Sequence, residues 1–203
     1  MLEFLQDSLL RLEDYLQTGG PVMVPLVLVS LGMWLLIIDR ALFFRRLGRR
    51  DLDLLAARRL VAEGRLPDPR RHRGATAWLV AEFLHQRTGR QALDRYVLDE
   101  IVVRLQRRST EHLAAIGVLA AIAPLLGLLG TVTGMIATFD VLAVFGTGNA
   151  RAMAGGISEA LITTQTGLLV AIPGLYMKGF FDRRAQRLRQ HFSAMGLYLA
   201  RHL

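Results

Sequence analysis

Glycines and threonines recur at helical spacing inside one long uncharged stretch of this chain. One helix face would carry four of them, at i, i+4, i+7 and i+11: Gly127, Thr131, Gly134 and Thr138. Gly130 and Gly134 also form a pair of small residues four apart, a spacing that lets membrane helices approach closely. Such a face suits tight packing, and its hydroxyls could also hold water or the carboxylate of a partner.

A second polar set lies in a later uncharged stretch. Two adjacent helix faces would carry it, with Glu159, Thr163 and Thr166 on one and Thr164 with Gly167 on the other. A carboxylate at the edge of a membrane span is costly unless it faces protein or water, which makes Glu159 a functional candidate. A single threonine is explained by packing, with its hydroxyl bonded to its own helix, but this grouping favours a polar pathway. The predicted pathway residues are Thr131, Thr138, Glu159, Thr163, Thr164 and Thr166. The predicted helix-packing positions are Gly127, Gly130, Gly134 and Gly167.

Three uncharged stretches must position these groups. They run from Tyr15 to Ile38, from Leu113 to Phe139 and from Ala160 to Met177, which is 24, 27 and 18 residues. About 20 apolar residues cross a hydrocarbon core of roughly 30 Å. In a chain of 203 residues, three buried core helices would leave too little sequence to cover them. We therefore predict an all-α membrane protein with three transmembrane helices, two of them kinked at Pro124 and Pro173.

The basic residues predict the orientation of these spans. The chain has 25 basic and 17 acidic residues, and 23 of the basic ones lie between Arg40 and His112 or after Met177. Basic segments stay on the cytoplasmic side. The N-terminus and the 140–158 connection are thus expected outside, with the middle segment and the C-terminus inside. Because topology explains the excess positive charge, no nucleic-acid partner is expected.

The segments follow from these boundaries. In chain order we predict an outer amphipathic helix (1–18), a first span (19–44), a cytoplasmic helical segment (45–112), a second span (113–139), a periplasmic connection (140–158), a third span (159–178) and a cytoplasmic C-terminal helix (179–203). Within the middle segment, one helix would begin at an Asp51 cap and stop at Gly64, and a second would cover 76–88. A third would start near Gln91 and continue unbroken into the second span. An apolar stripe on the last helix suggests that it packs in a cytoplasmic bundle: Leu188, Phe192, Met195 and Leu199.

Few residues suggest covalent chemistry or ligand binding outside the spans. The chain has no cysteine, and its five histidines are not spaced as metal ligands. No phosphate loop is present, so we predict no catalytic residues, no metal and no cofactor. The arginine runs at 45–50 and 70–73 could bind anionic lipid headgroups, although membrane topology alone explains them more simply.

Three runs of residues resemble the signatures of a known family. The first run is APLLGLLGTVTGM at 123–135. The second is GGISEAL at 155–161, followed by Thr164, by GL at 167–168 and by AIP at 171–173. The third is GGPVMVP at 19–25. The first two resemble the second-span and third-span signatures of the MotA/TolQ/ExbB proton channel family. The last is similar to the start of the first span in short ExbB-like members. Three spans favour ExbB or TolQ, because MotA-like proteins have four.

The resemblance implies a multi-pass protein of the bacterial inner membrane that forms a pentamer. Its second and third spans would line a pore around an ExbD-like single-span partner, with Thr131 and Thr164 facing the partner's membrane aspartate and Glu159 toward the periplasmic end. Proton passage would then energise a TonB-like transducer for import across the outer membrane. Family members often have small apolar residues at Thr163, Gln165 and Thr166, and the polarity found there favours a wider hydrated path or sodium coupling.

The sequence fits this mechanism independently, because no carboxylate lies in the middle of a span. A proton path through this chain needs a partner's acid or water alone. Two other interpretations stay open: a TolQ-like stator for envelope maintenance, and a non-conducting membrane scaffold whose threonines and glycines only pack.

Overall fold

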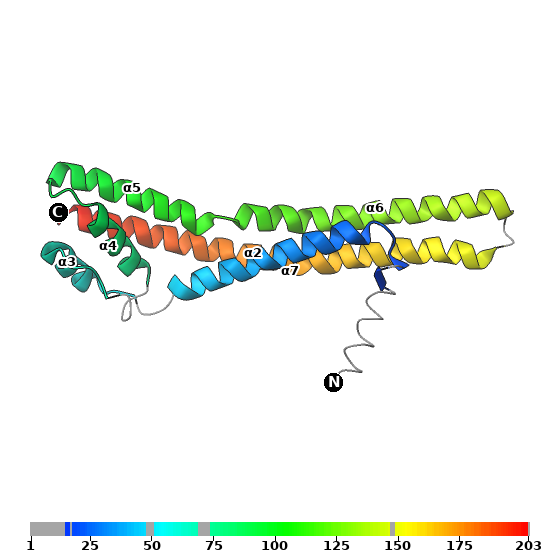
Figure 1. Cartoon of the computed structure of the whole chain (residues 1–203), viewed down its shortest axis with the longest axis horizontal. Helices are drawn as coiled ribbons and strands as arrows, with labels where there is room; N and C mark the ends of the chain where they lie inside the picture. Colours follow the sequence, from blue (N-terminus) through cyan, green and yellow to red (C-terminus); the bar gives the residue numbers. More distant parts are fainter. Residues whose placement is uncertain (1–14, 17, 48–50, 69–73, 147–148, 203) are drawn as a thin grey trace, which may run out of the picture. The chain divides into compact units, whose positions relative to one another are not determined.

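The structure is a computed structural model of the whole chain, and it describes residues 15–16, 18–47, 51–68, 74–146 and 149–202. Helices account for nearly all of this part, and no strand occurs in it. Figure 1 shows them in chain order: α2 (Met23–Leu47), α3 (Leu54–Glu63), α4 (Ala75–Gln86), α5 (Gln91–Thr110), α6 (Leu113–Phe145) and α7 (Ala150–Ala200). The predicted all-α class is confirmed. Most of the helix predicted over 1–18 lies outside the described residues.

Within the described residues, three helical stretches are long and apolar enough to cross a membrane, as the sequence predicted. They are α2, the α5–α6 stretch and α7, with hydropathies of 2.0, 2.3 and 1.4 over their most apolar windows. No more than a third of each window is buried in a single chain (22%, 33% and 28%), and Leu28 and Leu169 keep 65% and 70% of their surface. Apolar surface of this extent is stable only against lipid or other protein chains.

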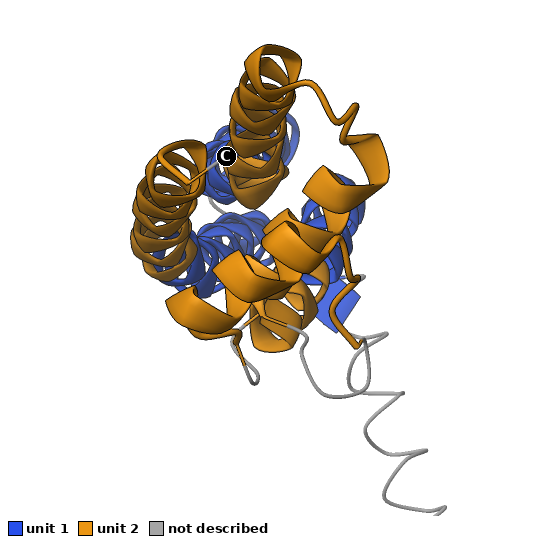
Figure 2. Ribbon diagram, turned by 90° about the vertical axis from the view of Figure 1, so that its left-hand side faces the viewer, with its two compact units in different colours: residues 1–37, 115–178 blue, residues 38–114, 179–203 orange. Residues whose placement is uncertain are grey.

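The chain divides into two compact units, coloured separately in Figure 2. Unit 1 contains 1–37 and 115–178, and unit 2 contains 38–114 and 179–203. In unit 1, the first turns of α2 place Met23 and Leu26 against two alanines, Ala123 of α6 and Ala171 of α7. The small alanine side chains allow α2 to lie close to both helices.

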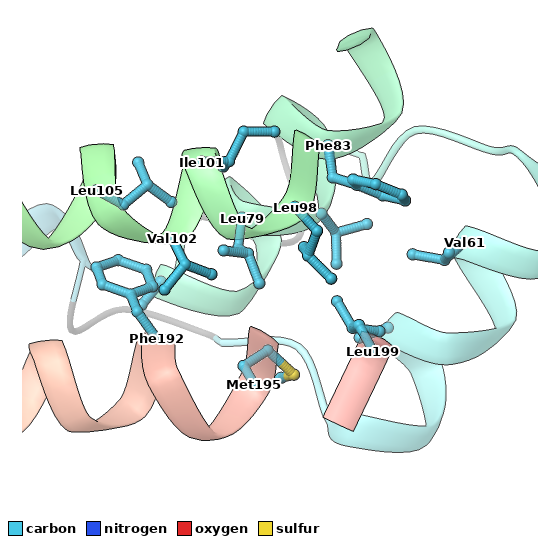
Figure 3. Packing of buried hydrophobic residues seen from close by; sticks show 13 residues of the cluster. Val61, Leu79, Phe83, Leu98, Ile101, Val102, Leu105, Phe192, Met195 and Leu199 are labelled. Carbon is cyan, nitrogen blue, oxygen red and sulfur yellow. The ribbon is translucent and has the colours of Figure 1, made fainter. Parts of the chain in front are cut away.

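Unit 2 has a conventional core of large side chains. Its helices α3, α4, α5 and the end of α7 enclose a buried cluster that includes Phe83, Ile101, Phe192 and Leu199, drawn from close by in Figure 3. The stripe predicted on the last helix is confirmed, because Phe192, Met195 and Leu199 are buried here and Leu188 packs at the edge. This burial comes from the 3.6-residue period of α7.

The short helices of unit 2 have well-formed ends, with one correction to the sequence prediction. Gly64 ends α3 in the left-handed conformation, at φ +66°, and its N–H bonds the Val61 carbonyl. The N-cap of α3 is Asp53 and not Asp51 as predicted. The Asp51 carboxylate instead accepts hydrogen bonds from the N–H groups of Leu52 and Thr76, and therefore caps the first turn of α4.

The helix predicted to run from Gln91 into the second span is interrupted by a two-residue turn. Glu111 and His112 separate α5 from α6, and His112 has a left-handed backbone, at φ +63°. The buried Arg40 guanidinium satisfies the end of α5 by donating to the Arg108 carbonyl at 3.1 Å. It also donates to His112 Nδ1 at 3.2 Å and to Asp39 at 3.0 Å. No signal in the sequence predicts this turn, because no glycine or proline occurs between Gln91 and Leu113.

Candidate functional site

The four glycines predicted as packing positions all lie where α6 and α7 touch. A Cβ built on Gly127 would lie 3.2 Å from the Thr164 Cα, and one on Gly167 would lie 2.6 Å from the Ala123 carbonyl oxygen. A Cβ on Gly134 would lie 3.0 Å from the Ala160 Cβ, and one on Gly130 would overlap the Thr163 side chain. The two backbones therefore approach too closely for larger residues, as expected of small-residue helix packing.

Two of the predicted pathway threonines are buried between these helices. The Thr163 hydroxyl donates to carbonyls of its own helix, those of Glu159 and Ala160, both at 3.0 Å. The Thr138 hydroxyl does the same with the Gly134 carbonyl at 2.9 Å. Both side chains are enclosed by protein. In a single chain, these two positions have the geometry of packing residues.

Thr131 and Thr164 lie in partly exposed positions on the same pair of helices. The Thr164 hydroxyl lies 3.0 Å from the Ala160 carbonyl on its own helix and 3.3 Å from the Gly127 carbonyl of α6. Thr131 lies one turn after Gly127 on α6, and its hydroxyl donates to the Leu128 carbonyl at 2.6 Å. Each hydroxyl oxygen keeps acceptor capacity after these bonds. These two threonines therefore combine a polar oxygen with access from outside the helix pair.

Glu159 and Thr166 lie on another face of α7, against the segment that precedes α2. The Tyr15 hydroxyl and the Thr166 Oγ1 are 2.8 Å apart. The Glu159 carboxylate lies against Gly20, where a Cβ would be 2.6 Å from the Glu159 Cδ. Gly20 has φ +67°, so both its backbone conformation and its proximity to Glu159 require glycine. The polar residues of α7 thus divide between two neighbours, α6 and the 15–20 segment.

Sequence reasoning missed Tyr15 and Gly20 as partners of this polar set. The Gly19–Gly20 pair was a signal for a turn, but no spacing rule connects residue 15 with residue 166. Pro124 and Pro173, predicted as kinks, lie inside α6 and α7, which both continue through them as helix. Among the described residues, no group of three or more histidine, aspartate or glutamate side chains gathers as metal ligands would.

Three titratable groups of unit 2, Asp51, Asp94 and His191, have pKa values shifted from their ordinary values. Burial raises the pKa of Asp94, but hydrogen bonds from Thr88 and Arg87 outweigh it and leave the pKa below its ordinary value. Asp51 behaves similarly, since hydrogen bonds from His191, Leu52 and Thr76 overcome its burial and lower its pKa. The hydrogen bond to Asp51 in turn raises the pKa of His191. These carboxylates cap and connect helices, so their charges stabilise unit 2.

Comparison with known proteins agrees with the motifs of the two helices. The family model of the MotA/TolQ/ExbB proton channel family matches residues 72–194. The ExbB-like 1 protein of Synechocystis is 35% identical over 199 residues, covering 92% of this chain and 76% of that relative. The biopolymer transport protein ExbB of Salmonella typhimurium is 32% identical over 182 residues, covering 80% and 72%. The ExbB protein of Aquifex aeolicus is 36% identical over 83 residues, covering 41% and 56%.

The chain therefore belongs to the MotA/TolQ/ExbB proton channel family, and its three apolar helices are those of a membrane protein.

Proposed function

We propose that this chain is an ExbB-like stator subunit of the bacterial inner membrane. Together with an ExbD-like partner that carries a membrane aspartate, it would couple the proton motive force to a TonB-like transducer for outer-membrane import. The observation that carries this proposal is the pair of hydroxyls at Thr131 and Thr164, partly exposed on helices that contain no carboxylate at mid-span. The role is transport, and no step requires catalysis of a chemical reaction.

A proton pathway along this face needs a carboxylic acid that a partner protein supplies. The deepest carboxylate on α7, Glu159, stands at the start of the uncharged stretch and lies against Gly20. A partner aspartate placed opposite Thr131 and Thr164 would find hydroxyls able to donate to its charged form and to accept from its protonated form. Such a site lowers the cost of an aspartate in the membrane without fixing its protonation state.

The proposed topology places the N-terminus and the 140–158 connection in the periplasm, and it places the segments 45–112 and 179–203, which make up most of unit 2, in the cytoplasm. The support is the distribution of basic residues, 23 of which fall in the two segments assigned to the cytoplasm. With this orientation, the segments proposed from the sequence (1–18, 19–44, 45–112, 113–139, 140–158, 159–178 and 179–203) alternate consistently across the membrane.

Assembly into a homopentamer around the partner is part of the proposal. It is supported by the exposed apolar surface of α6 and α7, where Leu125, Leu128 and Leu161 stand open in one chain. Surface of this kind on both helices suits contact with further copies and with lipid. The relatives compared above carry the name ExbB, which favours the import role over a TolQ-like role in envelope maintenance.

Proton flux tests the pathway. Thr131→Val and Thr164→Val remove the hydroxyls with little change in volume, and each should reduce flux at least about tenfold in liposomes that contain the protein and its partner. Thr133→Val is the matched control, because its hydroxyl is bonded to the Leu129 and Gly130 carbonyls on another face of α6. Full flux in both pathway variants, with the oligomer intact, would leave the non-conducting scaffold as the better interpretation.

Cysteine labelling tests the topology, since the chain has no cysteine of its own. Arg151→Cys places a thiol on the proposed periplasmic side, and Arg65→Cys places one on an exposed side chain of the proposed cytoplasmic side. An impermeant maleimide added to intact spheroplasts should label the first and not the second. The reverse pattern would invert the proposed orientation.

A further inference from the structure

A pocket of about 410 Å³ lies in unit 2, where the end of α2 meets α7 and the start of α4. Two arginines of α7, Arg184 and Arg187, form its basic side. Phe44, Leu47 and Leu188 form its apolar side. A cationic wall beside an apolar wall suits a ligand that is anionic at one end and apolar at the other.

The two arginines have spare hydrogen-bonding capacity. Arg184 is held in place by one hydrogen bond, to the Phe44 carbonyl at 3.2 Å, and by its position over the Phe44 ring at 5.7 Å. A guanidinium has five N–H groups, so most of those on Arg184 stay available. Arg187 is exposed one turn further along and forms no hydrogen bond or ion pair within the described part of the chain.

The carboxylate that lines the pocket does not cancel this charge. Asp51 accepts from the Leu52 and Thr76 N–H groups at 2.8 and 2.9 Å, and its other oxygen lies 3.5 Å from His191 Nε2. Asp51 is therefore engaged by the α4 terminus and by His191. Two positive charges remain on the α7 side, which favours an anion that brings acceptor oxygens.

The pocket lies at the level of the lipid headgroups, given the topology proposed above. Phe44 lies six positions after Ile38, which ends the first uncharged stretch, and Arg184 lies six positions after Lys178. Six helical residues rise about 9 Å, and the headgroup layer of one leaflet is roughly 5 to 7 Å thick. Side chains on α7 tilt toward its N-terminus, which is the direction of the membrane. From these positions, the long arginine side chains can reach back to the phosphates.

We propose that this pocket binds the phosphodiester of an anionic phospholipid from the cytoplasmic leaflet. Arg184 and Arg187 donate to the phosphate oxygens, while Phe44, Leu47 and Leu188 contact the glycerol and the first methylenes of the acyl chains. The site selects a lipid with an uncompensated negative charge, because a choline headgroup would bring a cation against two arginines. The leaflet assignment rests on the proposed topology, whereas the binding chemistry depends only on the residues of the pocket.

Native mass spectrometry of the full-length protein in a neutral maltoside detergent tests the proposal. The protein is titrated with dioleoylphosphatidylglycerol, with dioleoylphosphatidylcholine and with inorganic phosphate. Arg187→Gln should weaken phosphatidylglycerol binding about tenfold, as expected for the loss of one charged hydrogen-bonding partner. The matched control is Arg183→Gln, which removes another exposed arginine of α7 that does not line the pocket, and its binding should equal that of the wild type.

Arg184→Gln is a second variant, and circular dichroism should show that it keeps its helix content. Equal losses in the Arg183 and Arg187 variants would show general surface attraction and overturn the site. Displacement of the lipid by equimolar inorganic phosphate, or equal binding of phosphatidylcholine, would overturn the lipid assignment. The measurement needs neither partner nor proton gradient, so a failed flux test of Thr131 and Thr164 would leave its result unchanged.

Discussion

The helices of unit 1 pack through small residues, whereas the helices of unit 2 pack through large side chains. In unit 1, α6 and α7 meet through glycines, and the Gly167 Cα and the Ala123 carbonyl come close enough to exclude any Cβ. In unit 2, the helices meet through large side chains such as Phe83 and Phe192, which are fully buried. Adding atoms should therefore destabilise unit 1, and removing them should destabilise unit 2.

The difference follows from what surrounds each unit. The outward faces of α6 and α7 remain apolar, with Leu125 and Leu169 exposed, so burying apolar area gains little where lipid is the solvent. Close backbone packing and hydroxyls bonded within their own helix then provide the contacts. Water surrounds most of unit 2 in the proposed topology, and there the hydrophobic effect favours large buried side chains. Four sets of substitutions test the two units.

The largest effect is expected from Phe192→Ala in the core of unit 2. Phe192 has no exposed surface and contacts Trp78 edge-on, with ring centroids 6.4 Å apart. Loss of a buried phenylalanine costs about 3 to 5 kcal/mol. Thermal unfolding followed by circular dichroism in detergent should show a strongly lowered midpoint. Leu197→Ala, at an exposed position of the same helix, should leave the midpoint nearly unchanged.

Substitution of two neighbouring glycines of α7 tests how closely α6 and α7 pack in unit 1. A Cβ at Gly156 would lie 2.6 Å from the Gly134 carbonyl oxygen and 3.1 Å from the Thr138 nitrogen, whereas one at Gly155 meets nothing within 4 Å. Overpacking costs about 1 to 3 kcal/mol, and both alanines gain up to about 1 kcal/mol of helix propensity. Gly156→Ala should thus lower the unfolding midpoint and Gly155→Ala should hold or raise it. Equal midpoints would mean that α6 and α7 separate easily.

Asp94→Asn tests the polar side of unit 2. The buried Asp94 carboxylate accepts from the Thr88 N–H at 2.7 Å and from the Arg87 Nε at 3.3 Å, and Arg87 also donates to the Val61 carbonyl at the end of α3. The loss of charge should cost about 1 to 3 kcal/mol at neutral pH. Because the folded pKa lies below the ordinary 3.8, this stabilisation is present above pH 3.8. The gap between wild type and variant should therefore close as the pH falls through the folded pKa, and a constant gap would contradict the assigned role.

His191→Gln should have the smallest effect, below about 1 kcal/mol, since both His191 and Asp51 are partly exposed. The folded pKa of His191 is raised above 6.5, so its charged pair with Asp51 stabilises fully below pH 6.5. This contribution is lost as the pH rises through the folded pKa. Unfolding midpoints at pH 6 and pH 9 should show the wild type ahead of the variant only at the lower pH.

Much of the fold could be predicted from the sequence because it depends on local patterns. Uncharged runs determine the spans, Gly64 ends α3, and the Leu188–Leu199 stripe faces the core of unit 2. The errors concern choices that only three-dimensional contacts decide. Asp51 and Asp53 are equally good caps by residue type, and Asp51 caps α4 because Thr76 lies beside it in space.

The residues of the candidate site could be predicted from the sequence, but the neighbouring segment that each of them contacts could not. Spacing on a helical wheel placed Thr163 with Glu159 and Thr166, yet Thr163 is buried against Gly130 while Thr166 bonds Tyr15. A helical wheel gives the direction of each side chain but not which neighbour occupies that direction. The pathway roles of these residues remain predictions, since they depend on the partner and on further copies of the chain.

The turn at Glu111 and His112 has a consequence for how the sequence can vary. Each helical residue adds about 100° of rotation. In α7, which is continuous over 51 residues, one residue inserted between Gly156 and Phe192 would therefore rotate every later side chain by about 100° about the helix axis. The α5–α6 connection has no such constraint, because the turn resets the helical phase and Arg40 satisfies the Arg108 carbonyl there. Length changes in this family should therefore be absorbed near residues 111–112 and excluded from the middle of α7.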